Sequence, residues 1–182
     1  PYDQNLGWSA LGTLAGRNLV TVADLDRAAQ YNPSSISKNG YAFAIAAIPD
    51  ADHKAAAYKR IMEDSSLSND ALTSTANGFL RGDVELRTPY YKPFFDSLLS
   101  MWDTRSIGMA TRIVRGLYPR SLYNYGSAEG TGVSDNPSVA LAQEWLHKNP
   151  SAPSALRRLI LEAQDNAHRN MIGQQFNSSL SD

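Results

Sequence analysis

Apolar residues recur at helical spacing along almost the whole chain, and residues that start or end helices interrupt them at short intervals. Thr21 to Asp24 has the form of an N-cap followed by an acid in the first turn. Pro49 ends one apolar-periodic segment, and Asp50 opens the next. No segment shows the alternation of Val, Ile and Thr that is typical of a strand. The pattern therefore predicts an all-α fold of about nine mostly short helices.

Caps, prolines and glycines set the expected helix boundaries. Leu6, Ala10, Leu11 and Leu14 fall on one face of the first helix, which Gly16 and Asn18 end. The helix near Pro93 is expected to begin or kink there, because an internal proline loses a hydrogen bond and clashes with the preceding turn. The other helices are expected over residues 21–31, 34–48, 51–62, 66–80, 105–117 and 138–149, and from Ser151 or Ser154 onward.

Serial short helices of this kind predict paired antiparallel helices stacked into a curved layer, a solenoid of the HEAT or armadillo type. No repeat period is visible, so any repeat is degenerate. We expect one domain over residues 1–182 with a frayed tail at 177–182. The segment from Tyr118 to Pro137 is rich in Gly, Ser, Asn and Tyr, and it is predicted to be an irregular connector.

Composition excludes several classes of function. The formal net charge of −1 gives no electrostatic reason to bind nucleic acid or an anionic membrane. The absence of cysteine excludes disulfides, thiolate zinc sites and cysteine nucleophiles. No apolar run approaches the ~20 residues of a membrane-spanning helix. We therefore expect a cytoplasmic protein without a membrane span.

Residue types that carry chemistry are sparse. His53, His147 and His168 lie in separate predicted helices without a second histidine at i+4. Glu144 and His147 have the i, i+3 spacing of half a di-metal motif, but the single copy favours a solvated helix face. The glycines from Gly126 to Gly132 superficially suggest a phosphate loop. They lack a preceding strand and a Gly-Lys-Ser/Thr ending, which favours a plain connector.

Arginines form the more informative group. Arg105, Arg112 and Arg115 lie on or beside one predicted helix, and Tyr118 follows its end. Arg112 and Arg115 are i, i+3 neighbours that could face a cavity, although arginines near a helix C-terminus also favour the negative end of its dipole. Arg157 and Arg158 begin the last helix, where the dipole disfavours cations, so an acidic partner elsewhere is plausible for them.

Four blocks of sequence follow one another along the chain. They are Leu6-Gly-Trp-x-x-Leu11, Ala51 to Met62, the run Trp102-Asp-x-Arg105-Ser106 through Met109-Ala110, Ile113-Val114 and Gly116-Leu-Tyr-Pro119, and Ser154-Ala-Leu-Arg-Arg-Leu159. Together they resemble the C-terminal helical domain of bacterial aminopeptidase N family zinc metallopeptidases, the membrane alanyl aminopeptidase type. Gly108, where an acidic residue is expected, and Pro93, where a helix-compatible residue is usual, depart from this likeness.

The resemblance implies a non-catalytic domain. In such enzymes a separate catalytic domain holds zinc through His-Glu-x-x-His and a distant glutamate, and this sequence contains no such motif. The helical domain packs over the catalytic domain of the same polypeptide, encloses a chamber and limits which peptides enter. The resemblance thus implies zinc for the parent enzyme and none for this chain. Arg105, Arg112, Arg115 and Tyr118 become candidate contacts to peptide substrates in that chamber.

Two other readings remain. A stand-alone helical-repeat module that binds a protein partner would show the same helix pattern. A small metalloenzyme would have to use Glu144 and His147.

Overall fold

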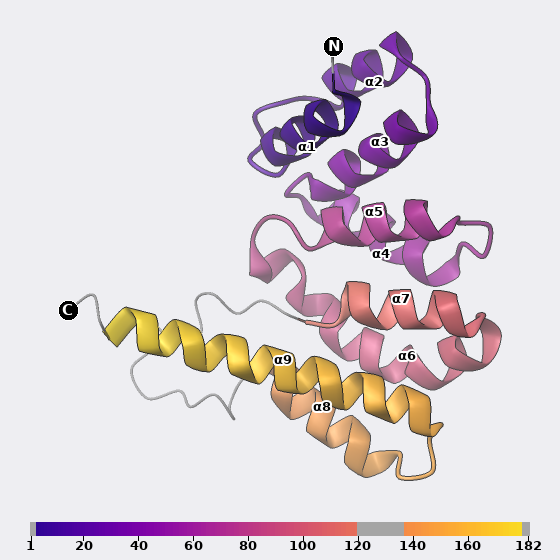
Figure 1. The fold of residues 1–182 in the computed structure, drawn as a ribbon, viewed down its shortest axis with the longest axis vertical. Helices are drawn as coiled ribbons and strands as arrows, with labels where there is room; N and C mark the ends of the chain where they lie inside the picture. Colours follow the sequence, from indigo (N-terminus) through magenta and orange to yellow (C-terminus); the bar gives the residue numbers. More distant parts are fainter. Residues whose placement is uncertain (1–2, 120–136, 180–182) are drawn as a thin grey trace. The chain divides into compact units, whose positions relative to one another are not determined.

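Every regular element that the structure describes is helical. The computed structural model describes residues 3–119 and 137–179, and within them it confirms the all-α prediction (Figure 1). The short 3-10 turns η1 (Val84–Leu86) and η2 (Thr88–Tyr90) precede α6. The α-helices are α1 (Gln4–Ala15), α2 (Val22–Tyr31), α3 (Ser35–Ala47), α4 (Ala51–Glu63), α5 (Asn69–Phe79), α6 (Tyr91–Thr104), α7 (Ile107–Leu117), α8 (Pro137–Lys148) and α9 (Ser154–Ser179).

The contacts between helices divide the chain into two compact units. Unit 1 extends to Pro89 and unit 2 begins at Tyr90. In unit 1, α3 packs between α1 and α5, while α2 contacts α3 and α4 contacts both α3 and α5. In unit 2, α6 and α7 form one hairpin, α8 and α9 form another, and α6 contacts α8 while α7 contacts α9 (Figure 1). A continuous solenoid and a single domain over residues 1–182 stay predictions.

Side-chain caps explain where most helices begin. A capping side chain accepts a backbone N–H of the first turn and so satisfies one of the donors that have no partner within the helix. At α2 the cap is reciprocal, because the Asp24 carboxylate also accepts the Thr21 N–H. The caps predicted at Thr21 and Asp50 are confirmed, and Ser34 caps α3. The full set of caps is Asp3, Thr21, Ser34, Asp50, Ser68 and Ser106.

Two predicted helix starts are wrong by a few residues, each for a local reason. The helix expected from Ser66 begins at Asn69, because Ser66 donates both its N–H and its hydroxyl to the Asp64 carboxylate and forms a turn instead. The helix expected from Arg105 begins at Ile107. Arg105 has extended backbone at the end of α6, and Ser106 is the cap of α7.

Pro93 sits within α6 without breaking it. The helix begins two residues earlier, at Tyr91, which makes Pro93 its third residue. The first four N–H groups of a helix have no partner within it, so proline loses no hydrogen bond there. The expected connector from Tyr118 to Pro137 falls mostly on residues 120–136, which lie outside the described residues. α9 continues to Ser179, while residues 180–182 of the expected frayed tail also lie outside them.

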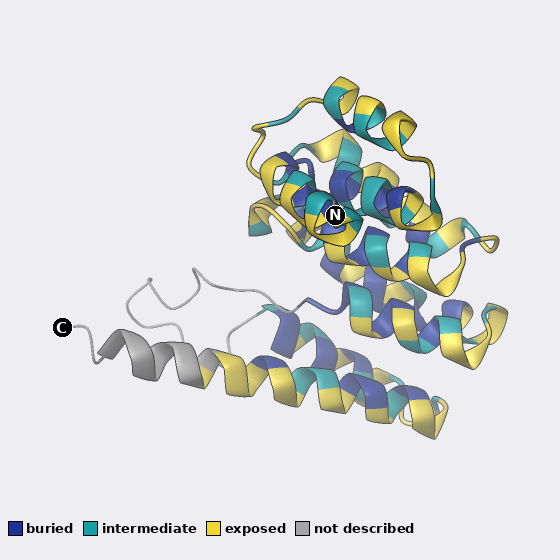
Figure 2. Ribbon diagram, turned by 45° about the horizontal axis from the view of Figure 1, so that its top comes forward, coloured by how far each residue is buried: buried dark blue, intermediate teal, exposed yellow. Residues whose placement is uncertain are grey.

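The first helix buries a different face from the one that its leucines suggest. Trp8, Gly12 and Ala15 are buried against the rest of unit 1, whereas Leu6 and Leu14 are exposed. The indole ring determines this orientation: its Nε1–H donates to the Ser37 hydroxyl, at 3.2 Å. Of the predicted apolar face of α1, Leu11 packs against the core, whereas Leu6, Ala10 and Leu14 are exposed. Figure 2 shows the mixture of buried and exposed residues along the helices of unit 1.

Glycine permits close helix contacts in the core of unit 1. A Cβ atom built on Gly78 of α5 would lie 2.1 Å from the backbone oxygen of Phe43, and one on Gly40 of α3 would lie 2.2 Å from the Trp8 ring. Real Cβ atoms essentially never approach other atoms so closely. These positions therefore require glycine because a neighbouring helix already occupies the space of a side chain.

Aromatic rings fill the core of unit 2. Tyr118, directly after α7, lies edge-on to Phe95 with ring centroids 5.9 Å apart, and edge-on to Phe94 at 6.5 Å. Such edge-to-face arrangements are favoured by the charge distribution of the rings. Leu156, Leu159, Ile160 and Ala167 bury the predicted apolar stripe of α9 in the same unit. Met171, the last residue predicted for that stripe, has a side chain outside the described residues.

Candidate functional site

The three candidate arginines lie on or beside α6 and α7. Arg105 ends α6 and is partly buried, whereas Arg112 and Arg115 are exposed on α7. The Arg112 guanidinium donates Nη1–H to the Gly108 carbonyl on its own helix, at 3.2 Å. Arg115 lines a pocket of unit 2, and Arg105 and Arg112 do not. Arg115 is thus the one candidate arginine in the lining of this pocket, and a chamber contact by any of the three stays a prediction.

That pocket lies between α7 and α9 and has a volume of about 420 Å³. Its polar lining comes from Arg115 on one side and from Glu162, Asn166 and Asn170 on the other. The three α9 residues are spaced by four, which places them on one face of the helix. A guanidinium, a carboxylate and two carboxamides offer both donors and acceptors, which is chemistry suited to the backbone and ends of a peptide.

Tyr118 contributes to the same pocket but is otherwise a core residue. Its side chain is almost fully buried, and its hydroxyl donates to the Ser138 carbonyl at 3.5 Å. Burial raises the pKa of the Tyr118 hydroxyl above its ordinary value of 10.0, because the charged phenolate would lose its hydration. The group is therefore a neutral hydrogen-bond donor at physiological pH.

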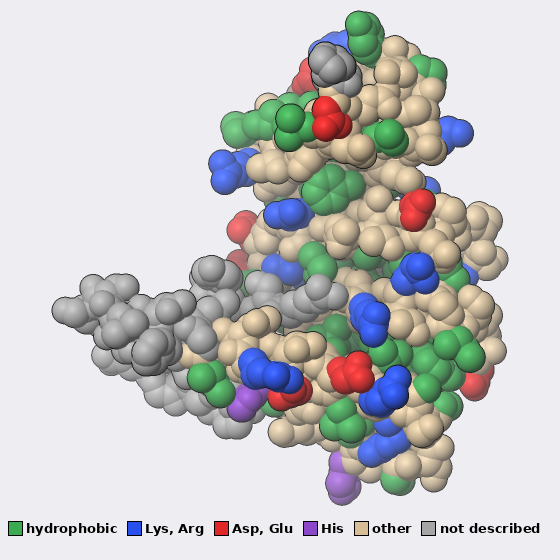
Figure 3. All heavy atoms as spheres, viewed as in Figure 1, with side chains coloured by type: hydrophobic (Ala, Val, Ile, Leu, Met, Phe, Trp, Pro, Cys, Tyr) green, Lys and Arg blue, Asp and Glu red, His purple; other side chains and the backbone are tan. Residues whose placement is uncertain are grey.

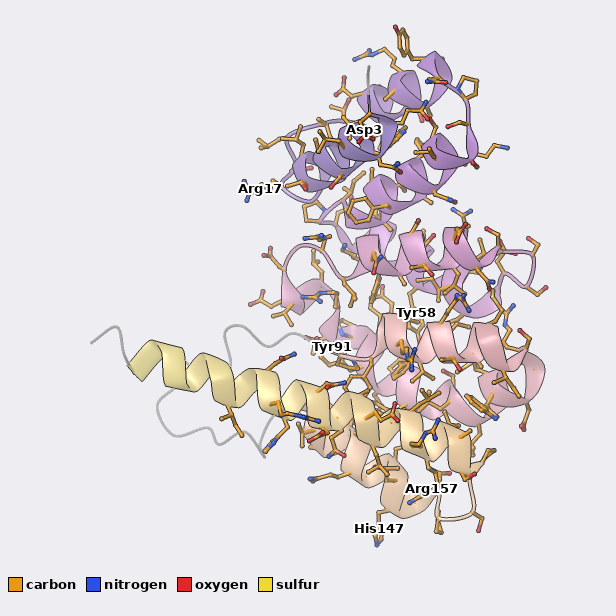
Figure 4. The ribbon with its side chains drawn as sticks, viewed as in Figure 1. Asp3, Arg17, Tyr58, Tyr91, His147 and Arg157 are labelled. Atoms are coloured by element: carbon orange, nitrogen blue, oxygen red, sulfur yellow. The ribbon has the colours of Figure 1, made fainter. Side chains whose placement is uncertain are left out.

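The described residues offer no metal centre. The His53 ring bonds through Nδ1 to the Asp50 carboxylate at 2.6 Å, and Asp50 also caps α4. Glu144 pairs with Lys148 on α8, not with His147, which is exposed and points away from its helix (Figure 4). No group of three or more potential ligands occurs in the described ranges. Residues 3–119 and 137–179 thus do not fit a catalytic zinc, which needs three protein ligands converging on one point.

Arg157 and Arg158 have partners close in sequence. Arg157 donates Nη1–H to the carbonyl oxygens of Leu146, at 2.8 Å, and Asn149, at 2.6 Å. It therefore satisfies the C-terminal end of α8, where a cation also complements the helix dipole. Arg158 pairs with Glu162 one turn along α9. The expected acidic partner is wrong for Arg157, which binds backbone carbonyls. Arg158 does have an acidic partner, and that acid lies on its own helix.

A buried lysine in unit 1 escaped the sequence analysis. Lys54 on α4 is fully buried and donates from Nζ to the carbonyl oxygens of Ala46, at 2.7 Å, and Gly78, at 3.3 Å. These carbonyls lie at the C-terminal ends of α3 and α5, so one ammonium binds two helix ends. A signal existed in the sequence, because Lys54 falls on the same helix face as the buried Ala57 and Ile61.

The environment of Lys54 lowers the pKa of its ammonium group. Burial, and secondarily the positive charge of Arg87, lowers the pKa of Lys54 from 10.5 to about 8, while Asp50 acts in the opposite direction. Both bonded carbonyl groups belong to the helix framework, and the side chain is closed to solvent. The contacts therefore give Lys54 a structural role.

Among the described residues, no helix is both long enough and apolar enough to cross a lipid bilayer.

Comparisons with known proteins found a matching family model and a similar curated protein. Residues 1–169 match the family model described as the ERAP1-like C-terminal domain. The chain is also similar to an aminopeptidase N of Streptomyces lividans, with 26% identity over 182 residues, which covers 99% of this chain and 20% of that protein. The chain thus spans about a fifth of the length of this curated relative. On the family match, the chain belongs to the ERAP1-like C-terminal domain family.

Proposed function

We propose that this chain is the non-catalytic helical domain of a zinc-dependent aminopeptidase that removes N-terminal amino acids from peptides. The match to the ERAP1-like C-terminal domain over residues 1–169 carries the proposal. The similarity to a fifth of an aminopeptidase N supports the view that catalysis belongs to another part of a longer polypeptide. The parent enzyme is proposed to be cytoplasmic, which the lack of cysteine fits.

The donor groups of this chain support a role other than bond cleavage. The sequence has three histidines and no His-Glu-x-x-His, and His53 is already bonded to Asp50. A catalytic zinc site requires convergent ligands with one position left open for water or substrate. In this proposal the catalytic domain of the same polypeptide holds the zinc.

The proposed role of the helical domain is to cover the active-site chamber and to limit the access of peptides. A rigid helical wall excludes substrates by shape, and charges along it guide those that enter. Arg105, Arg112, Arg115 and Tyr118 are the proposed chamber contacts. Arg115 is the strongest of these because it lines the α7–α9 pocket together with Asn166 and Asn170. Its guanidinium would bind a peptide carboxylate through two parallel hydrogen bonds.

The purified 182-residue chain tests the central part of this proposal. We expect it to bind no stoichiometric zinc and to release no amino acid from peptide substrates. The longer polypeptide should bind zinc and should release N-terminal amino acids. Metal analysis and an aminopeptidase assay of the two proteins provide the measurement. Zinc-dependent release of N-terminal amino acids by the short chain would refute the proposal.

Charge reversal in the longer enzyme tests the pocket. The Arg115→Glu variant should raise KM for long peptides by at least about tenfold, because it removes the charge-assisted hydrogen bonds of the guanidinium, and leave KM for dipeptides unchanged. Arg60→Glu is the control, because Arg60 is an exposed arginine of α4 that is not among the proposed chamber contacts. An unchanged KM for long peptides in the Arg115 variant would exclude Arg115 as the contact.

A further inference from the structure

Helix α1 is apolar on two opposite sides. Its inner side carries Trp8, Gly12 and Ala15, which are buried in unit 1. Its outer side carries the α1 outer stripe, which consists of Leu6, Ala10 and Leu14. These residues are spaced by four and therefore lie along one line of the helix surface. The polar residues Asn5, Ser9 and Thr13 lie beside the stripe and are exposed, but the stripe itself is apolar.

The outer stripe is well exposed in this chain. Leu6 is 70% exposed and Leu14 is 38% exposed, and Leu19, just beyond the helix, is 65% exposed. Charged residues occur at Asp3 and Arg17, at the two ends of the helix, and none lies between them. Figure 3 shows hydrophobic side chains gathered over this end of unit 1, next to the basic side chain that Figure 4 labels Arg17.

The neighbouring helix α2 shows what an ordinary solvent face looks like in the same unit. Its surface carries an ion pair between Asp24 and Arg27, both of them exposed, and only Leu25 is fully buried. A helix that ends a stack needs such a polar outer face to stay in contact with water. Helix α1 has no charged residue on its outer face, although it lies at the edge of the contacts within unit 1. Its outer stripe therefore has the composition of an interface.

We propose that the α1 outer stripe is a docking surface for the rest of the longer polypeptide, and that Leu6 and Leu14 insert into an apolar surface of that partner. This inference rests on the proposed function. The occupant follows from length: the chain corresponds to 20% of its aminopeptidase N relative, so a large further part of such a polypeptide is available to cover the stripe. The uncharged stripe matches an apolar partner and not an acidic or basic one.

Cysteine labelling tests this surface cleanly, because the chain has no cysteine of its own. Single Leu6→Cys and Leu14→Cys variants are prepared in the 182-residue chain and in the longer polypeptide, and the rate of alkylation by a polar maleimide is measured. Arg27→Cys on α2 is the matched control, at a side chain that is 74% exposed. Circular dichroism of each variant verifies folding.

In the 182-residue chain all three cysteines should react rapidly. In the longer polypeptide the cysteines at positions 6 and 14 should react at least about tenfold more slowly, since labelling then requires local opening of the interface, while the control keeps its rate. Equal rates in both proteins would overturn the docking surface. Slow labelling in the short chain would also overturn it. In a monomer the stripe would then be covered within the chain, and in a self-associated chain it would be covered by a second copy.

A second pair of measurements separates this inference from the proposed function. The double variant L6E/L14E should leave the thermal midpoint of the 182-residue chain nearly unchanged and lower that of the longer polypeptide. If the longer polypeptide is an active aminopeptidase and its midpoint does not move, the docking surface is wrong and the proposed function stands. If the chain is not part of a longer polypeptide, the docking surface and the proposed function are both wrong.

Discussion

Units 1 and 2 bind their helices together by different means. In unit 1 the helices approach closely at Gly40 and Gly78, and the fully buried Lys54 binds the C-terminal carbonyls of two of them. In unit 2 the rings of Phe94, Phe95 and Tyr118 fill the space between helices. Arg157, which is only partly buried, binds the end of α8 (Figure 4). Unit 1 therefore combines close helix contacts at glycine with ring pairs such as Trp8–Tyr41, whereas a cluster of three rings fills the core of unit 2.

Lys54 and Arg157 perform the same task at different depths. Each cation donates to carbonyl groups that a helix end leaves without an intrahelical partner. Water can replace a partly exposed arginine at such a site, but it cannot readily replace a fully buried lysine. The same kind of contact should therefore stabilise unit 1 more than unit 2.

The largest difference in unfolding free energy is expected between two glycine-to-alanine variants, one in each unit. Gly78→Ala should destabilise the protein by roughly 3 kcal/mol, because the new Cβ would overlap the Phe43 backbone oxygen, which cannot move aside as a side chain can. Gly108→Ala on α7 is the control: its Cβ would meet only the end of Arg112, at 3.7 Å. That change should stabilise the protein by up to about 1 kcal/mol through helix propensity. Equilibrium unfolding in urea measures both, and equal effects would contradict the contrast in packing.

Removing the two cations should give the next largest difference. Lys54→Met should cost about 2 kcal/mol, because the carbonyl groups of Ala46 and Gly78 lose their buried donor. Arg157→Met should cost about 1 kcal/mol, because water can reach the carbonyl groups that it leaves. Lys59→Met, an exposed change on the same helix as Lys54, controls for the loss of a lysine. A larger loss for Arg157 than for Lys54 would reverse the comparison.

Alkaline pH should change the contributions of Lys54 in unit 1 and Tyr118 in unit 2 to the unfolding free energy in opposite directions. The pKa of Lys54 is lowered to about 8 by burial, so between pH 8 and 10.5 the unfolded chain holds a proton that the folded chain has lost. The contribution of Lys54 to the unfolding free energy should rise over this range by at most about 1.4 kcal/mol per pH unit. Burial raises the pKa of Tyr118, so the unfolded chain ionises first and the contribution of Tyr118 is lost above pH 10.

Differences between the wild type and single variants isolate these two contributions, because the other titrating groups cancel. The wild type minus Lys54→Met should gain unfolding free energy from pH 8 to 10, and the wild type minus Tyr118→Phe should lose it above pH 10. A pH-independent difference for Lys54→Met would show that Lys54 keeps an ordinary pKa.

The smallest effect is expected at the surface of unit 2. Arg158 pairs with Glu162, and both side chains are at least half exposed. Arg158→Ala should therefore change the unfolding free energy by no more than about 0.5 kcal/mol, in contrast to the adjacent Arg157. A loss as large as that of Arg157→Met would indicate a further partner for Arg158.

Local signals in the sequence were sufficient to locate most helices. Thr21 and Asp50 predicted the starts of α2 and α4, because a capping side chain acts within its own turn. Pro93 predicted the start of α6 to within two residues. The predicted start of α5 at Ser66 was wrong, because a serine side chain can form a turn as readily as a helix cap.

Features that depend on distant residues were not predictable in this way. The buried face of α1 depends on a bond from Trp8 to Ser37, far along the chain, and the role of Lys54 depends on the ends of two other helices. At the candidate site, Arg115 was foreseen from its helix. Its pocket partners Asn166 and Asn170 were not, because α9 contributes them across a long gap in sequence.

The size of the polypeptide that contains this chain in its source cells tests the account most directly. An antibody raised against the 182-residue chain is used to probe a whole-cell lysate by immunoblot. The account predicts a band several times larger than 19.9 kDa, as expected for a domain that corresponds to a fifth of an aminopeptidase. A band only at the mass of the chain itself would contradict it and would favour a stand-alone helical-repeat binding module.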